Sequence, residues 1–92
     1  MIRNLKGRPL NRLYEHGERR GIRPDLVDAV IRILTLLDVA SSPEELRLPG
    51  FGLHALKGDL RGFWAVTVRA NWRIIFRFVD GDALDVELID YH

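Results

Sequence analysis

The spacing of hydrophobic positions divides the chain into a helical first half and an extended second half. Between residues 24 and 39 apolar side chains such as Val27, Val30, Ile31 and Leu34 recur every three to four positions. This period predicts an amphipathic helix, and proline at position 24 suits its first turn. From about residue 63 onward the apolar period becomes two, which predicts strands.

A shorter helix is expected before this one. Leu10, Leu13 and Tyr14 stand at helical spacing after Gly7-Arg8-Pro9, and Gly17 is expected to end the helix. The basic stretch 18–23 is then expected to be a loop. These features predict two main helices in the first 40 residues.

The second half predicts three strands joined by short turns. The strands cover residues 63–68, 72–79 and 84–89, with Asp80-Gly81-Asp82 as the second turn. Residues 1–5 could add a short edge strand. Ser42 and Glu45 have the spacing of a capping box, which predicts a helix of one or two turns, and residues 49–52 end it.

The register of the first hairpin decides which side chains share a face. A two-residue turn at Ala70 and Asn71 would mix charge with apolar residues. A three-residue loop over 69–71, with Asn71 left-handed, gives one apolar face. It pairs Val68 with Trp72, Val66 with Ile74 and Trp64 with Phe76. The other face, away from the helices, then carries Arg73 and Arg77.

The length of 92 residues predicts one domain, 1–92, of the α+β class, with two main helices packed on one face of a small antiparallel sheet. The absence of cysteine excludes disulfides and thiolate metal sites. The chain has neither an apolar run long enough for a membrane span nor a secretory signal, so we expect a cytoplasmic protein with no membrane partner.

The net charge of +1 hides a segregation of charge along the chain. Residues 1–23 carry +5, 24–53 carry −3, 54–78 carry +4 and 79–92 carry −5. Most of the cations are arginine, whose planar group suits phosphate. Two basic blocks in one small domain favour an anionic partner, although solvated surface arginines would give the same composition.

Cleavage of RNA without a metal requires a base for the 2′-hydroxyl, an acid for the leaving oxygen and cations for the phosphate. Histidine suits the proton transfers. His54 stands at the entrance to the sheet, three residues before Lys57, and Asp90-Tyr91-His92 ends the chain directly after a strand. A structural histidine, a solvated lysine and a frayed tail are the alternative interpretations.

Arg73 lies in the middle of the predicted open face, where a charge needs either a functional partner or a cross-strand ion pair with Asp85 or Glu87. A metal site built from His54, Asp90 and His92 is disfavoured, because nearby Lys57 and Arg73 would repel a cation. We therefore expect no metal and no cofactor.

These residues resemble the RelE/ParE toxin superfamily, and within it the HigB (host-inhibition-of-growth) branch. The similar segments are His54-Ala55-Leu56-Lys57-Gly58-Asp59, Gly62-Phe63-Trp64, Val68-Arg69-Ala70-Asn71-Trp72-Arg73-Ile74-Ile75-Phe76 and Asp90-Tyr91-His92. The resemblance covers essentially the whole chain. It departs at Ala55, where close relatives would carry proline.

The resemblance implies a microbial RNase-like fold and the toxin of a type II toxin–antitoxin system. The implied activity is cleavage of mRNA in the ribosomal A site, by metal-independent attack of the 2′-hydroxyl on the adjacent phosphate. The implied catalytic residues are His54, Lys57, Arg73, Asp90, Tyr91 and His92. In the implied assignment His92 would be one proton-transfer partner and His54 or Asp90 the other, while Lys57 and Arg73 would hold the phosphate.

The resemblance also implies partners. Ribosomal RNA would contact basic residues, for which the candidates are Arg3, Lys6, Arg8, Arg19, Arg20, Arg23 and Arg77. A cognate helix-turn-helix antitoxin of the HigA type would neutralise the toxin, which we expect to be a monomer when free. Two alternatives stay open: a gyrase-inhibiting toxin of the ParE type on the same fold, and a non-enzymatic partner of a repressor antitoxin.

Overall fold

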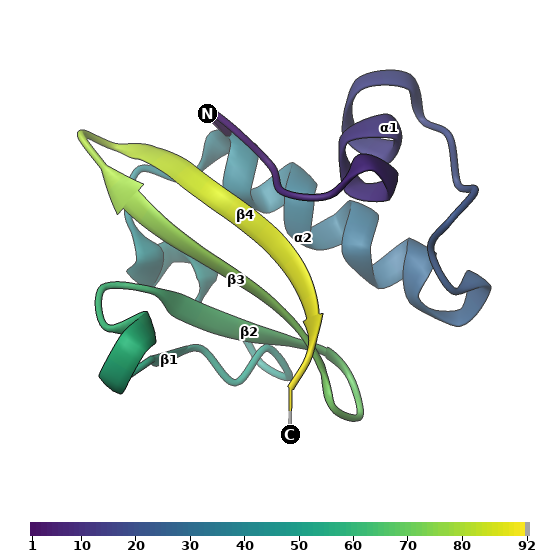
Figure 1. Ribbon diagram of the computed structural model, residues 1–92. Coiled ribbons are helices and arrows are strands. Elements are labelled where there is room, and N and C mark those ends of the chain that lie inside the picture. The colour runs from purple at the N-terminus through teal and green to yellow at the C-terminus, as the bar shows by residue number, and fades with distance from the viewer. Residues whose placement is uncertain (92) are drawn as a thin grey trace.

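The computed structural model describes residues 1–91 and forms an α+β fold, as the sequence predicts. Its two α-helices pack on one face of a four-stranded antiparallel sheet of order β1-β2-β3-β4 (Figure 1). The elements are α1 (Arg8–His16), α2 (Val27–Val39), β1 (His54–Ala55), β2 (Trp64–Arg69), β3 (Trp72–Val79) and β4 (Asp82–Asp90). Three short 3-10 helices are η1 (Pro24–Leu26), η2 (Pro43–Leu46) and η3 (Gly58–Leu60). In the described part of the chain, no helix has the length and apolar character needed to span a bilayer.

The predicted helix boundaries are largely confirmed. Gly17 ends α1 with a φ of 69°, and its N–H donates to the carbonyl of Leu13 at 3.0 Å. Pro24 does open the second helical segment, but its first turn is the 3-10 helix η1 rather than α-helix. The capping box before η2 is also present, since a Glu45 carboxylate oxygen accepts the N–H of Ser42 at 3.1 Å.

The first hairpin follows the predicted register but not the predicted loop. The confirmed pairs are Trp64 with Phe76 and Val66 with Ile74. The expected pairing of Val68 with Trp72 and the three-residue loop are wrong: Arg69 pairs with Trp72, and Ala70, not Asn71, is left-handed with a φ of 51°. A β-bulge between Thr67 and Arg69 gives β2 one more residue than β3 at this point. The hairpin can therefore close with a two-residue turn while the strands beyond the bulge keep a single apolar face.

The second hairpin turns at Asp80 and Gly81, whose φ values of 52° and 82° are both positive, as two-residue hairpin turns require. β4 therefore begins two residues earlier than predicted. A second bulge lies in β4, where the register against β3 shifts between Ile75 and Arg77 and Asp85 has a φ of 52°. At the N-terminus, the expected edge strand amounts to two isolated parallel bridges to β4, at Ile2 and Leu5.

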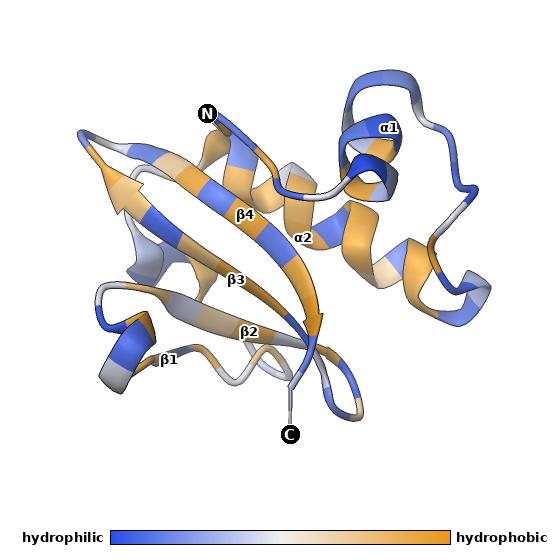
Figure 2. Ribbon diagram, in the orientation of Figure 1, coloured by the Kyte–Doolittle hydropathy of each residue, from blue (hydrophilic) through white to orange (hydrophobic). Residues whose placement is uncertain are grey.

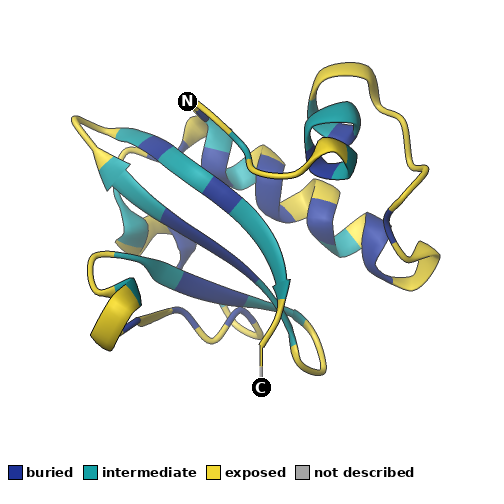
Figure 3. Cartoon of the chain, viewed as in Figure 1, coloured by how far each residue is buried: buried dark blue, intermediate teal, exposed yellow. Residues whose placement is uncertain are grey.

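The main core lies between the helices and the inner face of the sheet. Residues such as Val30, Leu37, Ile74 and Phe76 are completely buried there. Trp64 and Trp72 pack against this core, as predicted from the alternation. Figure 2 shows the alternation of apolar and polar residues along β4, and Figure 3 shows burial concentrated in α2 and the middle of the strands.

The outer face of the sheet is not open along its whole length, which corrects the prediction from the sequence. A second, smaller cluster of Leu56, Ala65 and Ile75 is buried on this face. Leu60 and Phe63 pack against it, because the chain after β1 folds back through η3 before it enters β2. Arg73 and Arg77 are consequently half-buried on either side of Ile75 rather than free in solvent.

Candidate active site

His54 occupies the two-residue edge strand β1 and faces the outer side of the sheet. It pairs with Ala65 of β2, and residues that are directly opposite in a sheet point to the same face. The imidazole is exposed, and its Nδ1 lies 2.9 Å from the carbonyl oxygen of Gly52. One side of the ring is thus held by the backbone while the other is accessible.

Arg73 lies on the same face, two strands away. In β3 it pairs with Thr67 on one side and Ile89 on the other. Its guanidinium donates to the backbone carbonyls of Ala70, in the hairpin turn, and Trp72, the latter at 3.1 Å. These hydrogen bonds fix the cation at the end of the sheet where the first hairpin turns, and leave donors of the group for another partner.

Tyr91 brings the two groups together. It follows β4 directly, and its N–H donates to the carbonyl of Asn71 at 2.7 Å, which anchors the tail to the hairpin. Its ring is 6.4 Å from the His54 ring, edge to face, and 6.0 Å from the Arg73 guanidinium carbon. An imidazole, a guanidinium and a phenol from three separate segments therefore form one cluster, in which His54 and Tyr91 are exposed and Arg73 is half-buried.

The other predicted catalytic residues are not part of this cluster as the structure describes it. Lys57 is exposed just before η3. Its Cα lies within about 11 Å of the His54 Cα, because three extended residues span no more than that. Asp90 pairs with Trp72, which places it on the face opposite to Tyr91. There the Arg23 pKa is raised chiefly by a hydrogen bond to Asp25, with a small contribution from the charge of Asp90. His92 lies outside the described residues.

Most of the predicted RNA-binding cations have acidic partners. Distances between the charged atoms are 2.7 Å for Arg3–Asp82, 2.6 Å for Arg23–Asp25, 2.7 Å for Arg77–Asp85, 3.7 Å for Arg19–Asp28 and 3.9 Å for Arg20–Glu18. Lys6 and Arg8 are exposed. These are surface pairs of small energy, which a phosphate can replace.

The ion pair expected as the alternative for Arg73 is made by Arg77 instead. The bulge at Asp85 moves this carboxylate toward Arg77, 2.7 Å away. Hydrogen bonds from Asn4 and then Arg77 lower the pKa of Asp85 below its ordinary value. Since Arg77 takes Asp85, the guanidinium of Arg73 is left to the backbone carbonyls and the Tyr91 ring.

Gly52, which lies in this neighbourhood, was not singled out from the sequence. Gly52, with a φ of +57°, supplies the carbonyl beside His54, and a Cβ at this position would be 3.2 Å from the hydroxyl of Thr67. Glycine in the 49–52 break was interpreted only as a helix terminator. The sequence contains no pattern that would single out its backbone oxygen.

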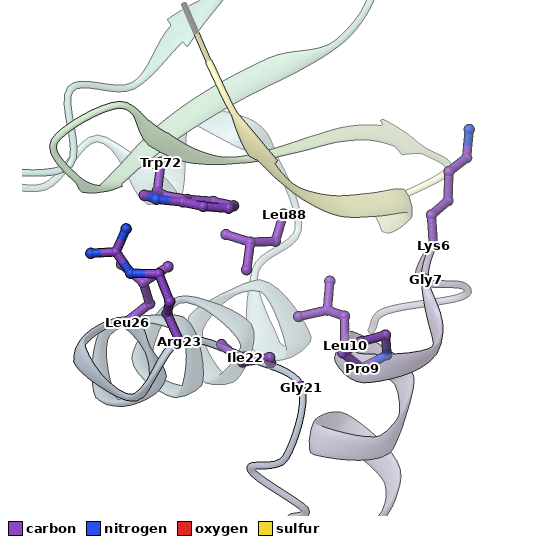
Figure 4. Close-up of a pocket in the computed structure, with 10 residues that line it drawn as sticks. All are labelled: Lys6, Gly7, Pro9, Leu10, Gly21, Ile22, Arg23, Leu26, Trp72 and Leu88. Atoms are coloured by element: carbon purple, nitrogen blue, oxygen red, sulfur yellow. The ribbon is translucent and has the colours of Figure 1, made fainter.

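A pocket of about 260 Å³ lies on the opposite, helix-covered side of the sheet (Figure 4). Trp72 and Leu88 form its sheet wall, and Lys6 and Arg23 lie among the residues that line it, with the Arg23 guanidinium 5.9 Å from the Trp72 ring. It is separate from the cluster around Tyr91. Within residues 1–91, no group of three His, Asp or Glu side chains is arranged to hold a metal ion.

The cluster can therefore move a proton through an imidazole and hold an anion with a guanidinium beside an aromatic ring. That combination suits a phosphodiester of a single-stranded nucleic acid, whose bases can stack on exposed rings.

Comparison with known proteins agrees with the family expected from the sequence. A family model described as a RelE-like toxin of the type II toxin–antitoxin system HigB matches residues 3–92. The chain is 42% identical to "Endoribonuclease HigB" of Proteus vulgaris, over the full length of both proteins. It is 34% identical to "Toxin HigB-1" of Vibrio cholerae over 90 residues, which is 96% of this chain and 95% of that protein.

The fold also matches a solved structure. The crystal structure of a point mutant of YafQ from E. coli aligns with a TM-score of 0.57 over 90% of this chain and 83% of that one. Its sequence identity is 20%, so this likeness concerns the fold alone.

Proposed function

Because this chain belongs to the HigB-like family of RelE-like toxins of type II toxin–antitoxin systems, we propose that it is an endoribonuclease that cuts mRNA on the ribosome. The observation that carries the proposal is the convergence of His54, Arg73 and Tyr91 on one exposed end of the sheet. The Proteus vulgaris relative, 42% identical over its whole length, is named an endoribonuclease.

The proposed reaction is attack of the 2′-oxygen on the adjacent phosphorus, without a metal. The new bond between the 2′-oxygen and phosphorus forms as the bond to the 5′-oxygen breaks. The 2′-hydroxyl proton goes to a base on the toxin, and an acid gives a proton to the departing 5′-oxygen. The products are a 2′,3′-cyclic phosphate and a 5′-hydroxyl.

The residues take roles that follow from their chemistry. His54 exchanges one of the two protons, and His92 at the chain terminus exchanges the other. Arg73 and Lys57 compensate the charge that builds on the phosphate, and Tyr91 supports the scissile nucleotide by stacking and hydrogen bonding. Asp90 is the alternative to His54 as a proton-transfer partner, although its pairing with Trp72 places it on the other face of the sheet.

The single domain 1–92 works in the cytoplasm with two macromolecular partners in this proposal. Ribosomal RNA contacts the basic residues Arg3, Lys6, Arg8, Arg19, Arg20, Arg23 and Arg77 through its phosphates, a salt-sensitive and sequence-independent interaction. A cognate helix-turn-helix antitoxin of the HigA type neutralises the free, monomeric toxin.

The test uses a defined message in a purified translating system, with and without ribosomes. We expect wild-type protein to cut only the ribosome-bound message and to leave 5′-hydroxyl ends. A 2′-O-methyl group at the scissile nucleotide blocks the cut, because it removes the attacking hydroxyl. His92→Ala and Arg73→Ala are expected to cut much more slowly.

An uncut message would contradict the proposal. Inhibition of DNA gyrase supercoiling by the same protein would then favour the ParE-type alternative, which does not need this cluster. Growth arrest without either activity would favour the non-enzymatic alternative.

A further inference from the structure

The backbone beside His54 determines which of its two ring nitrogens carries hydrogen. The Gly52 carbonyl oxygen is 2.9 Å from His54 Nδ1, and a carbonyl can only accept a hydrogen bond. In the neutral ring this contact favours the tautomer in which Nδ1 donates, since the opposite tautomer would put two lone pairs against each other. Nε2 is then left with its lone pair, ready to accept a proton.

The residue before Gly52 is held in place by the neighbouring strand. The Thr67 N–H of β2 donates to the carbonyl of Phe51 at 2.7 Å, which docks the segment before β1 onto the sheet. Gly52 then takes a φ of +57°, a left-handed conformation that favours glycine. A side chain there would also press on Thr67, because a Cβ would be 3.2 Å from its Oγ1.

We propose that Gly52 is a positioning residue for His54: its carbonyl fixes the Nδ1–H tautomer, so that His54 Nε2 receives the 2′-hydroxyl proton. The inference rests on the proposed function and assigns His54 to the base, which leaves the acid to another group. After the transfer both ring nitrogens carry hydrogen, and the Nδ1–H to Gly52 bond becomes charge-assisted. Such bonds are about twice as strong as neutral ones, so the contact favours the state in which the proton has moved.

The direct test is the tautomer of His54 in the intact, ¹⁵N-labelled protein by NMR. The chain has three histidines, so a His54→Gln variant identifies the His54 signals. At a pH where the ring is neutral, we expect an unprotonated Nε2 and a protonated Nδ1. A protonated Nε2 as the main neutral form would overturn the inference, whatever the activity.

A substitution tests whether Gly52 is responsible. Gly52→Ala should move its carbonyl, mix the two tautomers and slow cleavage by roughly tenfold or more, since base catalysis contributes about 10²- to 10⁴-fold. Gly52→Ala with Thr67→Ala removes the 3.2 Å contact and should recover part of both signals. Unchanged tautomer and cleavage in folded Gly52→Ala would overturn the inference.

Gly50→Ala is the matched control for backbone strain. Gly50 also has a left-handed φ, +84°, but a Cβ there meets nothing within 4 Å, and its carbonyl does not reach His54. We expect wild-type tautomer and cleavage from this variant. Loss of both in Gly50→Ala would show that general strain of the loop, not the Gly52 carbonyl, controls His54.

The NMR result and the cleavage result separate the two claims. A protonated Nε2 in a protein that cuts ribosome-bound mRNA overturns the positioning role alone. The Nδ1–H tautomer in a protein that leaves the message intact overturns the proposed function, and with it the role of His54 as base.

Discussion

The small outer cluster of Leu56, Ala65 and Ile75 holds β1, and with it His54, against the sheet. Leu56 is 7% exposed and packs with Ala65 and Ile75, and its N–H donates to the Phe63 carbonyl at 2.9 Å. Leu56→Ala removes three carbon atoms, worth about 2.4 kcal/mol at roughly 0.8 kcal/mol each. The cluster lies at an edge where solvent can fill the gap, so we expect a loss of about 2.5 kcal/mol, near the low end of the usual range of about 2 to 5 kcal/mol.

A domain of this length has an unfolding free energy of about 5 to 14 kcal/mol, so Leu56→Ala should remain folded at room temperature. Its Tm should fall by roughly 10 to 20 °C, from about 4 to 8 °C per kcal/mol. Urea unfolding followed by circular dichroism measures the free energy directly. Cleavage should fall as well in the folded variant, since β1 loses its packing beside His54.

Val39→Ala is the control for this experiment, because Val39 is an apolar residue of α2 with 76% exposure. Its expected change is within about 0.5 kcal/mol, as for other surface substitutions. Should Leu56→Ala cost no more than Val39→Ala, the outer cluster does not hold β1.

The pKa of Tyr14 is raised to about 12, first by burial and then by the hydrogen bond to Asp38. The resulting stabilisation of the folded protein is present below about pH 10 and is lost as the pH rises from there toward 12. Tyr14→Phe should remove this loss in urea unfolding between pH 9 and 12; an unchanged slope would contradict it. The lowered pKa of Asp85, from Asn4 and then Arg77, contributes stability above about pH 4 that is lost on acidification. Asp85→Asn should flatten that loss, and an equally steep acid slope would refute it. Finally, the affinity for ribosomes should fall steeply in a salt titration from 50 to 200 mM. A protein that makes six to ten phosphate contacts loses about 10³- to 10⁵-fold in affinity over this range. A flat salt profile would contradict phosphate recognition.

The sequence predicted the parts of the fold that depend on periodicity and local backbone chemistry. The end of α1 at Gly17 and the inward faces of β2 and β3 follow from side-chain spacing and from the freedom of glycine. The position of Arg73 on the outer face follows from the same alternation.

The two bulges could not be predicted, because a bulge leaves the apolar pattern intact on both sides of it. The bulge at Asp85 changes the ion pair, giving Asp85 to Arg77 instead of Arg73. The strand β1 has only two residues and carries no periodic signal, so the packing of Leu56 on the outer face depends on tertiary contacts alone.

The sequence does contain a pattern that separates Asp90 from Tyr91 in the tail. Asp90 and Tyr91 are adjacent at the end of a strand, and adjacent residues of a strand point to opposite faces. Alternation alone therefore separates the two side chains, although they belong to one motif. The structure accordingly brings Tyr91, and not Asp90, next to His54 and Arg73.

In the proposed reaction His54 and Arg73 act together on one phosphate. This joint action can be measured by single-turnover cleavage of a programmed ribosome by wild type, His54→Ala, Arg73→Ala and the double variant. Each single variant should lose about 10²- to 10³-fold in rate, and the double variant should lose little more, since residues that act as a unit are not additive. Cleavage at the wild-type rate by either folded single variant would contradict this joint action.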